Sequence, residues 1–487
     1  MFGVGRANVW ILLTLLAGPG HALAQCEATY ALAGGNCEHQ GVACAGDVDH
    51  DGTEDWLVGS HGTYAAVYSG ADGTIIHEYA EQGTHFGISV SGGGDFDGDE
   101  YSDYIIGECN RTVNSPGGRV RLYSGATGEV LRELRAPLGG YNFGCSIAIV
   151  GDMNDDGLDD VAVGAHCDQT VGSQAGRVIV YSSADGSIIY DLYGQAAGDH
   201  FGYCVAAAGD INNDGWPDLA VGATASSYGR TYIYSGHTGT ALYSLGAANE
   251  IYGYEVAGIG DANGDGYDDF AVGGFLELCR VTVVSGRNGF ALHVIDSPEG
   301  TDFFGVSLAG VGDIDRDGCG DILVGAPNST SGGLGSGRAY LYSGRTGSEL
   351  FEIGGASENA HLGWSVARAG DPDHNGLGDL LIGSGVFTGV GETSVVCMGQ
   401  GECTLVHCCS GKVGNANLSA EDEPTIGDIS AIVDFLYITG NPLPCLEEAD
   451  VNHSGGQWPT GEDVTITDIS LLIDHLYLTL SDLPDCL

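Results

Sequence analysis

The sequence predicts a mostly β protein, a seven-bladed β-propeller of four-stranded antiparallel blades, followed by a small α-helical calcium-binding module. Three observations predict it. An acidic pattern recurs seven times at intervals of about fifty residues, a spacing typical of propeller blades. Short runs rich in Val, Ile and Tyr flank each copy, as in the strands of an antiparallel meander. The C-terminal segment instead places its apolar residues at helical spacing.

The N-terminal residues 1–24 are predicted to be a signal peptide. Arg6 supplies the positive charge, residues 9–17 the apolar core, and Ala22-Leu23-Ala24 the small-residue cleavage site before Gln25. A lipoprotein signal at Cys26 is disfavoured because Gln25 stands where a small residue is expected. No later segment is apolar enough to span a bilayer. We therefore expect a secreted, extracellular or cell-surface protein with no transmembrane segment.

The charge of the chain restricts its partners. Its 66 acidic and 15 basic residues give a formal net charge of −51, so the folded chain would repel itself unless cations joined it. Nucleic acid is not expected as a partner, because its phosphates require a basic surface and Lys412 is the only lysine. An oxidising compartment would also explain the 15 cysteines, whose odd number leaves at least one unpaired.

Residues 25–398 contain the repeated units that we assign to the propeller. An aromatic-Gly pair and a short apolar run precede each acidic loop, as in FGISV from Phe86 and FGVSL from Phe304, although Leu362-Gly363 replaces the pair in the last unit and the first unit lacks it. A second run follows the loop, as in DVAVGA from Asp160, and then come a third, such as GRVIVYS from Gly176, and a fourth. Four such runs predict one four-stranded blade.

The first strand of the chain is predicted to close the ring. The last unit has three strands up to Val396 but no fourth before the cysteine-rich residues 399–413, which we assign to a linker. ATYALAGG from Ala28 resembles ELFEIGGA from Glu349, a fourth strand. We expect the N-terminal strand to complete the seventh blade, which would leave no open end in the ring.

The acidic loops are predicted to bind calcium. Each has an oxygen-bearing side chain at loop positions 1, 3, 5 and 9 around a tight glycine turn, although Glu100 replaces the glycine in one copy. Such a cluster of hard oxygen ligands suits Ca²⁺, with a backbone carbonyl and water completing six or seven oxygens. The candidate ligands are Asp47, Asp49, Asp51 and Asp55; Asp95, Asp97, Asp99 and Asp103; Asp152, Asn154, Asp156 and Asp160; Asp210, Asn212, Asp214 and Asp218; Asp261, Asn263, Asp265 and Asp269; Asp313, Asp315, Asp317 and Asp321; and Asp371, Asp373, Asn375 and Asp379.

The alternative is that these Asp-Gly and Asn-Gly segments are simple β-turns. A turn requires neither an acid at position 9 nor oxygen side chains at every odd position, and both recur in this chain. The pattern resembles the FG-GAP repeat of integrin α-subunit propellers over residues 28–398, with Phe304-Gly305 and Gly325-Ala326-Pro327 as its intact elements. The resemblance implies a seven-bladed propeller with calcium sites on one face and ligand binding elsewhere.

A ligand-binding surface is predicted opposite the acidic loops. The longer units have extra residues between their second and third strands, at CNRTVNSPGG from Cys109, HCDQTVGSQAG from His166 and PNSTSGGLGSG from Pro327. A meander directs these connections to the face away from the calcium loops, and insertions on one face of a repeat protein often mark its binding surface. The alternative is that they are tolerated surface loops.

The C-terminal residues 414–487 resemble a type I dockerin, which implies a cohesin-type partner. Two related segments end in predicted helices, GDISAIVDFLYI from Gly427 and TDISLLIDHLYL from Thr467. Their candidate calcium ligands are Asn415, Asn417, Ser419 and Asp428, and Asp450, Asn452, Ser454 and Asp468. Asp428 and Asp468 lie beyond the place that a strict loop requires. Pairing of Cys408 and Cys409 with Cys445 and Cys486 is a hypothesis, because connectivity cannot be read from sequence.

The motifs indicate binding rather than catalysis. We find no Gly-x-Ser-x-Gly motif, metal-ligating His pair or phosphate loop, and we expect no enzymatic activity. His166 and His200 are expected to be solvated loop residues. The leading hypothesis is a calcium-binding adhesion or scaffold protein that binds a protein or glycan through the propeller. The alternatives are a calcium-dependent propeller lectin and a non-catalytic subunit of an extracellular enzyme complex.

Overall fold

The computed structural model describes most of the predicted propeller. The described residues are 9–11, 24–31, 40–60, 64–81, 85–109, 118–135, 141–225, 229–246, 251–275, 279–300, 302–355, 357–372, 374–385 and 392–399. The predicted linker from residue 400 onward and the predicted module of residues 414–487 lie outside them. One compact unit comprises Met1–Val9 and Glu27–Gln400. Within the ranges given, no helix has the length and apolarity needed to cross a membrane.

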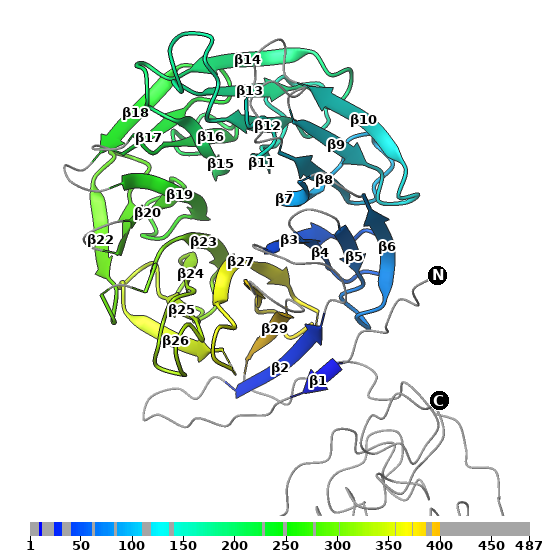
Figure 1. The fold of residues 1–487 in the computed structure, drawn as a ribbon, viewed down its shortest axis with the longest axis vertical. Coiled ribbons are helices and arrows are strands. Elements are labelled where there is room, and N and C mark those ends of the chain that lie inside the picture. The colour runs from blue at the N-terminus through cyan, green and yellow to red at the C-terminus, as the bar shows by residue number, and fades with distance from the viewer. Residues whose placement is uncertain are drawn as a thin grey trace, which may run out of the picture. The chain divides into compact units, whose positions relative to one another are not determined.

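Seven sheets form a closed ring, with one strand of each sheet near the centre and one at the rim (Figure 1). The inner strands are β3 (Gln40–Gly46), β7 (Phe86–Gly94), β11 (Ser146–Ile149), β15 (Phe201–Gly209), β19 (Ile251–Gly260), β23 (Ser307–Gly312) and β27 (Leu362–Gly370). The second strands are β4 (Asp55–Ser60), β8 (Asp103–Glu108), β12 (Val161–Ala165), β16 (Asp218–Ala223), β20 (Asp269–Phe275), β24 (Asp321–Ala326) and β28 (Asp379–Ser384). The prediction of seven four-stranded antiparallel blades is confirmed.

The outer half of each sheet contains a third and a fourth strand. The third strands are β5 (Tyr64–Tyr68), β9 (Arg119–Tyr123), β13 (Arg177–Tyr181), β17 (Arg230–Tyr234), β21 (Arg280–Val284), β25 (Arg338–Tyr342) and β29 (Glu392–Gly399). The fourth strands are β6 (Ile75–Ala80), β10 (Val130–Arg135), β14 (Ile188–Tyr193), β18 (Ala241–Gly246), β22 (Ala291–Asp296), β26 (Glu349–Gly354) and β2 (Ala24–Ala31). We number the blades from blade 1, which contains β3 to β6, to blade 7, which contains β27 to β29 and β2.

Blade 7 combines the two ends of the propeller chain, as the sequence predicts. Its sheet order is β1-β2-β29-β28-β27, so β2 is its fourth strand (Figure 1). The strand begins at Ala24 rather than at the predicted Ala28. Beyond it, β1 (Val9–Ile11) adds a short edge strand from within the predicted signal peptide. If the signal is removed as we predict, the mature blade has four strands like the others.

Side chains join blade 7 to blade 1 across the closure. The indole Nε1 of Trp56 donates a hydrogen bond of 2.9 Å to the carbonyl oxygen of Ala369. The Arg368 guanidinium pairs with the Glu54 carboxylate at 2.7 Å. Trp56 is 1% exposed, so this hydrogen bond lies in the core between the two blades. The seam is therefore closed by packing as well as by strand pairing.

The hydrophobic core lies between neighbouring blades. The aromatic residue of each aromatic-Gly pair is buried there, as the 1% exposure of Phe201 shows. Its ring lies edge-on to that of Tyr232 on β17, with the centroids 5.5 Å apart. Phe304 and Tyr340 repeat the arrangement at 5.7 Å in blade 6. Each blade thus covers the face of the next one, which requires the repeat to continue around the ring.

A pair of glycines sets how closely neighbouring blades approach. Gly222 lies in the Val-Gly-Ala segment of β16, and a Cβ atom there would overlap the carbonyl oxygen of Gly253 in blade 5. Gly325 has the same relation to Gly363 in the next blade. Only a residue without a side chain permits this backbone approach, which gives the two recurring glycines of the repeat a physical role.

Candidate functional site

The acidic loops all lie on one face of the ring, which we call the acidic face. Each loop connects an inner strand to the second strand of its blade, so position 1 follows the inner strand and position 9 lies at the start of the second. In blade 1 these positions are Asp47 and Asp55, the latter being the first residue of β4. The repeat therefore presents the same side chains at the same place seven times.

Each loop is turned by two residues with left-handed backbone conformation. In blade 1 these are His50 at position 4 (φ 61°) and Gly52 at position 6 (φ 94°). The Asp47 carboxylate stabilises the turn by accepting hydrogen bonds from the backbone N–H groups of Asp51 at 3.0 Å and Gly52 at 2.9 Å. Equivalent pairs of bonds are made by Asp152, Asp210, Asp261, Asp313 and Asp371.

The loop of blade 2 departs from this geometry. Glu100 occupies position 6 with φ 71°, a conformation that glycine adopts more readily. The Asp95 carboxylate accepts its shorter bond, 2.6 Å, from Gly98, and the bond from Glu100 lengthens to 3.4 Å. The deviation noted in the sequence thus changes the local hydrogen bonding without removing the loop.

The aspartate at position 9 is fully buried and connects the loop to a hairpin. Asp55 is 0% exposed. Its two carboxylate oxygens accept hydrogen bonds from the N–H of Val48 in the loop at 2.7 Å and from the N–H of Gly70, between β5 and β6, at 2.9 Å. Asp103, Asp218, Asp269 and Asp321 make the same two kinds of bond. The position-9 acid therefore has a structural role of its own, which the argument from sequence missed.

Burial changes the proton affinity of these aspartates. Burial raises the pKa of the position-9 carboxyls, although backbone N–H donors lower it in part. The pKa reaches about 7 for Asp55, Asp103, Asp160 and Asp321 and about 6 for Asp218 and Asp269. A bound cation would favour the ionised form of the same groups.

Position 3 divides the loops into two groups. Three loops place carboxylates together so that their oxygens lie within 4.8 Å of one another: Asp47, Asp49 and Asp55; Asp95, Asp97 and Asp99; and Asp313, Asp315 and Asp321. In the other group an asparagine amide donates to the position-9 carboxylate. The distances are 3.4 Å from Asn154 to Asp160, 3.2 Å from Asn212 to Asp218 and 2.9 Å from Asn263 to Asp269.

The carboxylate groups suit a divalent cation. Two oxygens that each lie about 2.4 Å from one Ca²⁺ ion are separated by at most about 4.8 Å, and the carboxylate oxygens of these three loops lie within 4.8 Å of one another. All their donors are hard oxygens, so they do not suit metals that prefer sulfur or nitrogen. Acidic groups of this chain could therefore hold a metal ion. Asp373 and the eight candidate ligands of residues 414–487 lie outside the described residues.

The opposite face contains a cavity at the mouth of the central channel. Its volume is about 650 Å³, and every blade contributes to it through residues in the first half of its inner strand. The ring centroids of His166 and Tyr203 are 5.0 Å apart, as are those of Tyr203 and Tyr254. Trp364 of blade 7 also lines the cavity. We call this set of side chains the channel mouth.

An acidic group lies among these aromatic residues. Glu255 lines the cavity beside the buried Cys204 thiol. Burial raises the pKa of Glu255, and the hydrogen bond with Cys204 offsets part of this rise. The resulting pKa is about 8. The positions after the aromatic-Gly pair, such as Ile88, Tyr203 and Trp364, vary within an otherwise regular repeat. That variability was the sequence signal by which the channel mouth could have been found.

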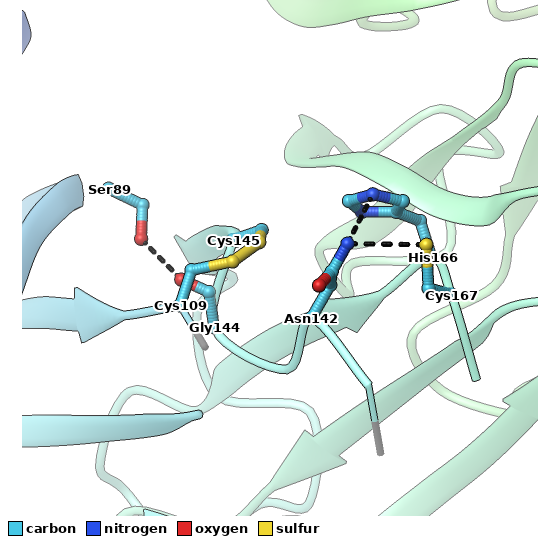
Figure 2. The surroundings of a disulfide bond; sticks show 7 residues. All are labelled: Ser89, Cys109, Asn142, Gly144, Cys145, His166 and Cys167. Atoms are coloured by element: carbon cyan, nitrogen blue, oxygen red, sulfur yellow. Dashed lines mark hydrogen bonds between the residues drawn. A yellow bond between two sulfur atoms is a disulfide. The ribbon is translucent and has the colours of Figure 1, made fainter. Parts of the chain in front are cut away.

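A disulfide fixes one side of the channel mouth. Cys109, after β8 in blade 2, is bonded to Cys145, just before β11 in blade 3 (Figure 2). Beside it, the Asn142 amide lies 3.0 Å from Nε2 of His166 and donates to the Cys167 sulfur at 3.2 Å. His166 lies on a loop as predicted, but it is half-buried rather than solvated. The hypothesis on Cys408, Cys409, Cys445 and Cys486 concerns residues outside the described ranges.

The predicted insertions lie on the face of the channel mouth. Residues 166–176 and 327–337 connect the second and third strands of blades 3 and 6 there, whereas residues 110–117 of the third insertion lie outside the described residues. The loop of blade 6 is anchored, because the Glu299 carboxylate accepts hydrogen bonds from the Ser329 hydroxyl at 2.7 Å and the Thr330 N–H at 2.9 Å. Burial alone would raise the pKa of Glu299, but these bonds and one from Ser331 lower it to about 2. This insertion is therefore a preformed surface.

Comparisons with known proteins agree with this architecture. The FG-GAP repeat family matches residues 201–237 and 304–342. Integrin alpha-4 of Xenopus laevis is 30% identical over 234 residues, which are 43% of this chain and 22% of that protein. Integrin alpha-6 of Gallus gallus is 35% identical over 157 residues (29% and 15%). Integrin alpha-V of Gallus gallus is 33% identical over 217 residues (39% and 21%).

The matched region is thus a small part of each relative, less than a quarter of its length. The crystal structure of BBS1N in complex with ARL6DN superposes with a TM-score of 0.49 and 10% identity over 74% of this chain and 93% of that chain. The matched FG-GAP residues include the buried Phe201 and Phe304 described above. This chain carries FG-GAP repeats in an integrin-α-like seven-bladed β-propeller.

Proposed function

We propose that this chain is a secreted or cell-surface, calcium-binding adhesion or scaffold protein that binds a protein ligand at the channel mouth. The observation that carries the proposal is the cavity of about 650 Å³, whose lining includes Tyr203, Tyr254, Trp364 and one acidic residue, Glu255. Aromatic side chains supply large contact areas at low entropic cost. The similarity to integrin α subunits favours such binding over catalysis.

A basic side chain of the partner fits this cavity best. The chain has a net charge of −51, which attracts cationic surfaces over long range. The tyrosine faces and the Glu255 carboxyl offer cation–π and ionic contacts, and a nearby cation would lower the pKa of Glu255 toward its usual value. We therefore propose an Arg or Lys side chain as the anchor of the protein ligand.

The binding role can be tested by immobilising the full-length protein in calcium and collecting extracellular proteins of the source. The Tyr203→Ala/Tyr254→Ala double variant should lose the proteins that the wild type retains. Phe290→Ala is the matched control, because Phe290 is an aromatic residue that is 73% exposed and does not line the cavity. Retention of the same proteins by the double variant would contradict the proposal.

We further propose that the acidic loops bind calcium as part of the folded state, with positions 1, 3, 5 and 9 as ligands. The support is the fit of the donor set and spacing in blades 1, 2 and 6. Elemental analysis of protein kept in millimolar Ca²⁺ and briefly desalted should find bound calcium. Its absence would exclude this part of the proposal.

The C-terminal residues 414–487 are proposed to dock to a cohesin-type partner, a role that rests on the dockerin resemblance alone. Full-length protein passed over an immobilised cohesin domain in calcium should be retained. Chain truncated after residue 413 should pass through, and equal retention of both would remove this role.

A lectin is the second candidate, and a pocket between two blades favours it. This pocket has a volume of about 280 Å³ and lies between blades 4 and 5, with Arg280, Thr282 and Val294 among its lining residues. A glycan array probed in calcium separates the two functions. Glycan binding that survives Tyr203→Ala/Tyr254→Ala but is lost in Thr282→Val would favour the lectin. The same result would fit a non-catalytic subunit of an extracellular enzyme complex that acts on polysaccharide.

A further inference from the structure

The six acidic loops whose position 3 is described differ in how their position-9 carboxylate is satisfied. In the carboxylate loops, residues 47–55, 95–103 and 313–321, position 3 is an aspartate. In the amide loops, residues 152–160, 210–218 and 261–269, position 3 is an asparagine whose Nδ2 donates to the carboxylate. Apart from the departure at Glu100 in blade 2, the two groups are built on the same backbone turn.

The carboxylate loops bring negative charges together. Asp49 and Asp55 belong to a set of oxygens within 4.8 Å of one another, and so do Asp315 and Asp321. No side chain of opposite charge is paired with Asp49 or Asp315 among the described residues. Like charges this close repel strongly when the carboxylates are partly desolvated. A cation between them is the means by which such a loop would be stabilised.

The amide loops already contain a donor where the carboxylate loops require a cation. The Asn263 amide reaches Oδ2 of Asp269 at 2.9 Å, and that oxygen also accepts from the Ala262 N–H at 3.0 Å. Asn212 donates to both oxygens of Asp218, at 3.3 and 3.2 Å. For its own oxygen to ligate a cation, the asparagine has to turn its amide over and give up this hydrogen bond. Binding at an amide loop therefore competes with an existing interaction.

The two groups occupy different arcs of the ring. Blades 3, 4 and 5 contain the amide loops and follow one another, whereas the carboxylate loops belong to blades 6, 1 and 2. Blade 7 lies between blades 6 and 1 and contains the closing strand β2 (Figure 1). The difference in chemistry therefore separates one half of the propeller from the half that includes its closure.

We infer that the calcium requirement of the ring is divided: the carboxylate loops need the cation to keep their structure, and the amide loops keep theirs without it. This inference rests on the calcium binding proposed above. On removal of calcium, the acidic face should loosen around blades 6, 1 and 2 and remain ordered around blades 3, 4 and 5. The asparagines at position 3 are the positioning residues that make this difference.

Hydrogen–deuterium exchange of the full-length protein tests the inference loop by loop. Chelation with EDTA should raise the exchange rate of amides in residues 47–55, 95–103 and 313–321 by about tenfold or more, with little change in residues 152–160, 210–218 and 261–269. A similar rise in all six loops would overturn the inference. If elemental analysis finds no calcium and chelation changes none of the loops, both the proposed calcium binding and the divided requirement fail.

Reciprocal substitutions provide the matched test. Asn263→Asp removes the amide donor and should make residues 261–269 sensitive to chelation. Asp315→Asn introduces the donor and should make residues 313–321 insensitive. Asp315→Asn tests the inference even if Asn263→Asp does not fold. It replaces a carboxylate of the cluster by a neutral amide, which removes a repulsion and should leave the fold intact. Unchanged sensitivity of residues 313–321 in Asp315→Asn would show that position 3 does not set the calcium requirement.

Discussion

Several non-glycine residues of the acidic loops have a left-handed backbone conformation, which such residues rarely adopt. Position 4 of the acidic loops takes a left-handed conformation even when it is Asp155 (φ 61°) or Arg316 (φ 62°). Position 6 is glycine in the other described loops but Glu100 in blade 2. A non-glycine residue in this region costs about 1–2 kcal/mol, which the surrounding hydrogen bonds have to offset.

Glu100→Gly should therefore stabilise the protein. Glycine adopts the observed φ of 71° without steric strain. After the larger entropy of glycine in the unfolded chain is included, we expect a gain of about 0.5–1 kcal/mol. Glu129→Gly, which removes the same charge from an exposed turn, is the control and should lower the stability. Urea unfolding in calcium measures both variants, and a loss of stability in Glu100→Gly would contradict the strain argument.

Glu255 should make stability depend on pH. Because burial raises its folded-state pKa from 4.5 to about 8, the folded protein binds a proton that the unfolded chain releases. The resulting stabilisation is complete below the unfolded pKa and is lost as the pH rises through 8. One such proton corresponds to a slope of about 1.4 kcal/mol per pH unit between the two pKa values.

The measurement compares thermal melts of wild type and Glu255→Gln between pH 5 and pH 9 in calcium. The variant keeps a neutral, hydrogen-bonding side chain, so its stability should fall less steeply over this range. Other titrating groups are common to both proteins and cancel in the difference. Parallel curves would show that Glu255 keeps an ordinary pKa in the folded state.

At the scale of elements, the two glycines of the repeat act across blades rather than within them. Gly222 in β16 allows the backbone of blade 5 to approach at Gly253. Blade 1 lacks the aromatic-Gly pair, so the equivalent glycine of blade 7, Gly383 in β28, faces the Val42 side chain, whose Cγ1 would lie 3.1 Å from an added Cβ. The contact is therefore rigid between most blades and adaptable at the seam.

Gly222→Ala should destabilise the protein more than Gly383→Ala. In the first variant the methyl group meets a backbone oxygen that cannot move without displacing its strand, and we expect a loss of about 1–3 kcal/mol. In the second variant the methyl group approaches only the Val42 side chain at 3.1 Å, a contact that a small shift relieves, so the loss should stay below about 1 kcal/mol. Chemical denaturation measures the difference, and equal losses would argue against a role in blade spacing.

Local patterns predicted the elements better than the contacts between them. The strands and the pairing of β2 with β29 follow from repetition and alternation, which are local properties. The structural role of Asp55 beside its proposed role as a ligand could not be predicted. Its partners Val48 and Gly70 donate through backbone N–H groups, which nearly every residue type has. The Cys109–Cys145 bond likewise joins two blades, and no spacing rule distinguished it from other pairings.

At the scale of the whole molecule, the net charge of −51 lowers the stability of the folded protein by self-repulsion, and the proposed cations raise it. Calcium bound only to the folded state at about 100 times its Kd stabilises by about 2.7 kcal/mol per site. Chelation should therefore lower the melting temperature. Adding NaCl in the presence of EDTA should restore only part of the loss, because salt screens general repulsion but does not ligate the loops. Full recovery in NaCl would mean that the loops need only screening.

The pairing of β2 with β29 also has a consequence for the order in which the protein forms. Strand β2 is made early and has to wait for β29, so blade 7 cannot form until synthesis has passed residue 399. Contacts this distant in sequence form slowly. During that interval strand β2 has no partner strand in the nascent chain. A chaperone could shield it, and a neighbouring copy of the chain could pair with it.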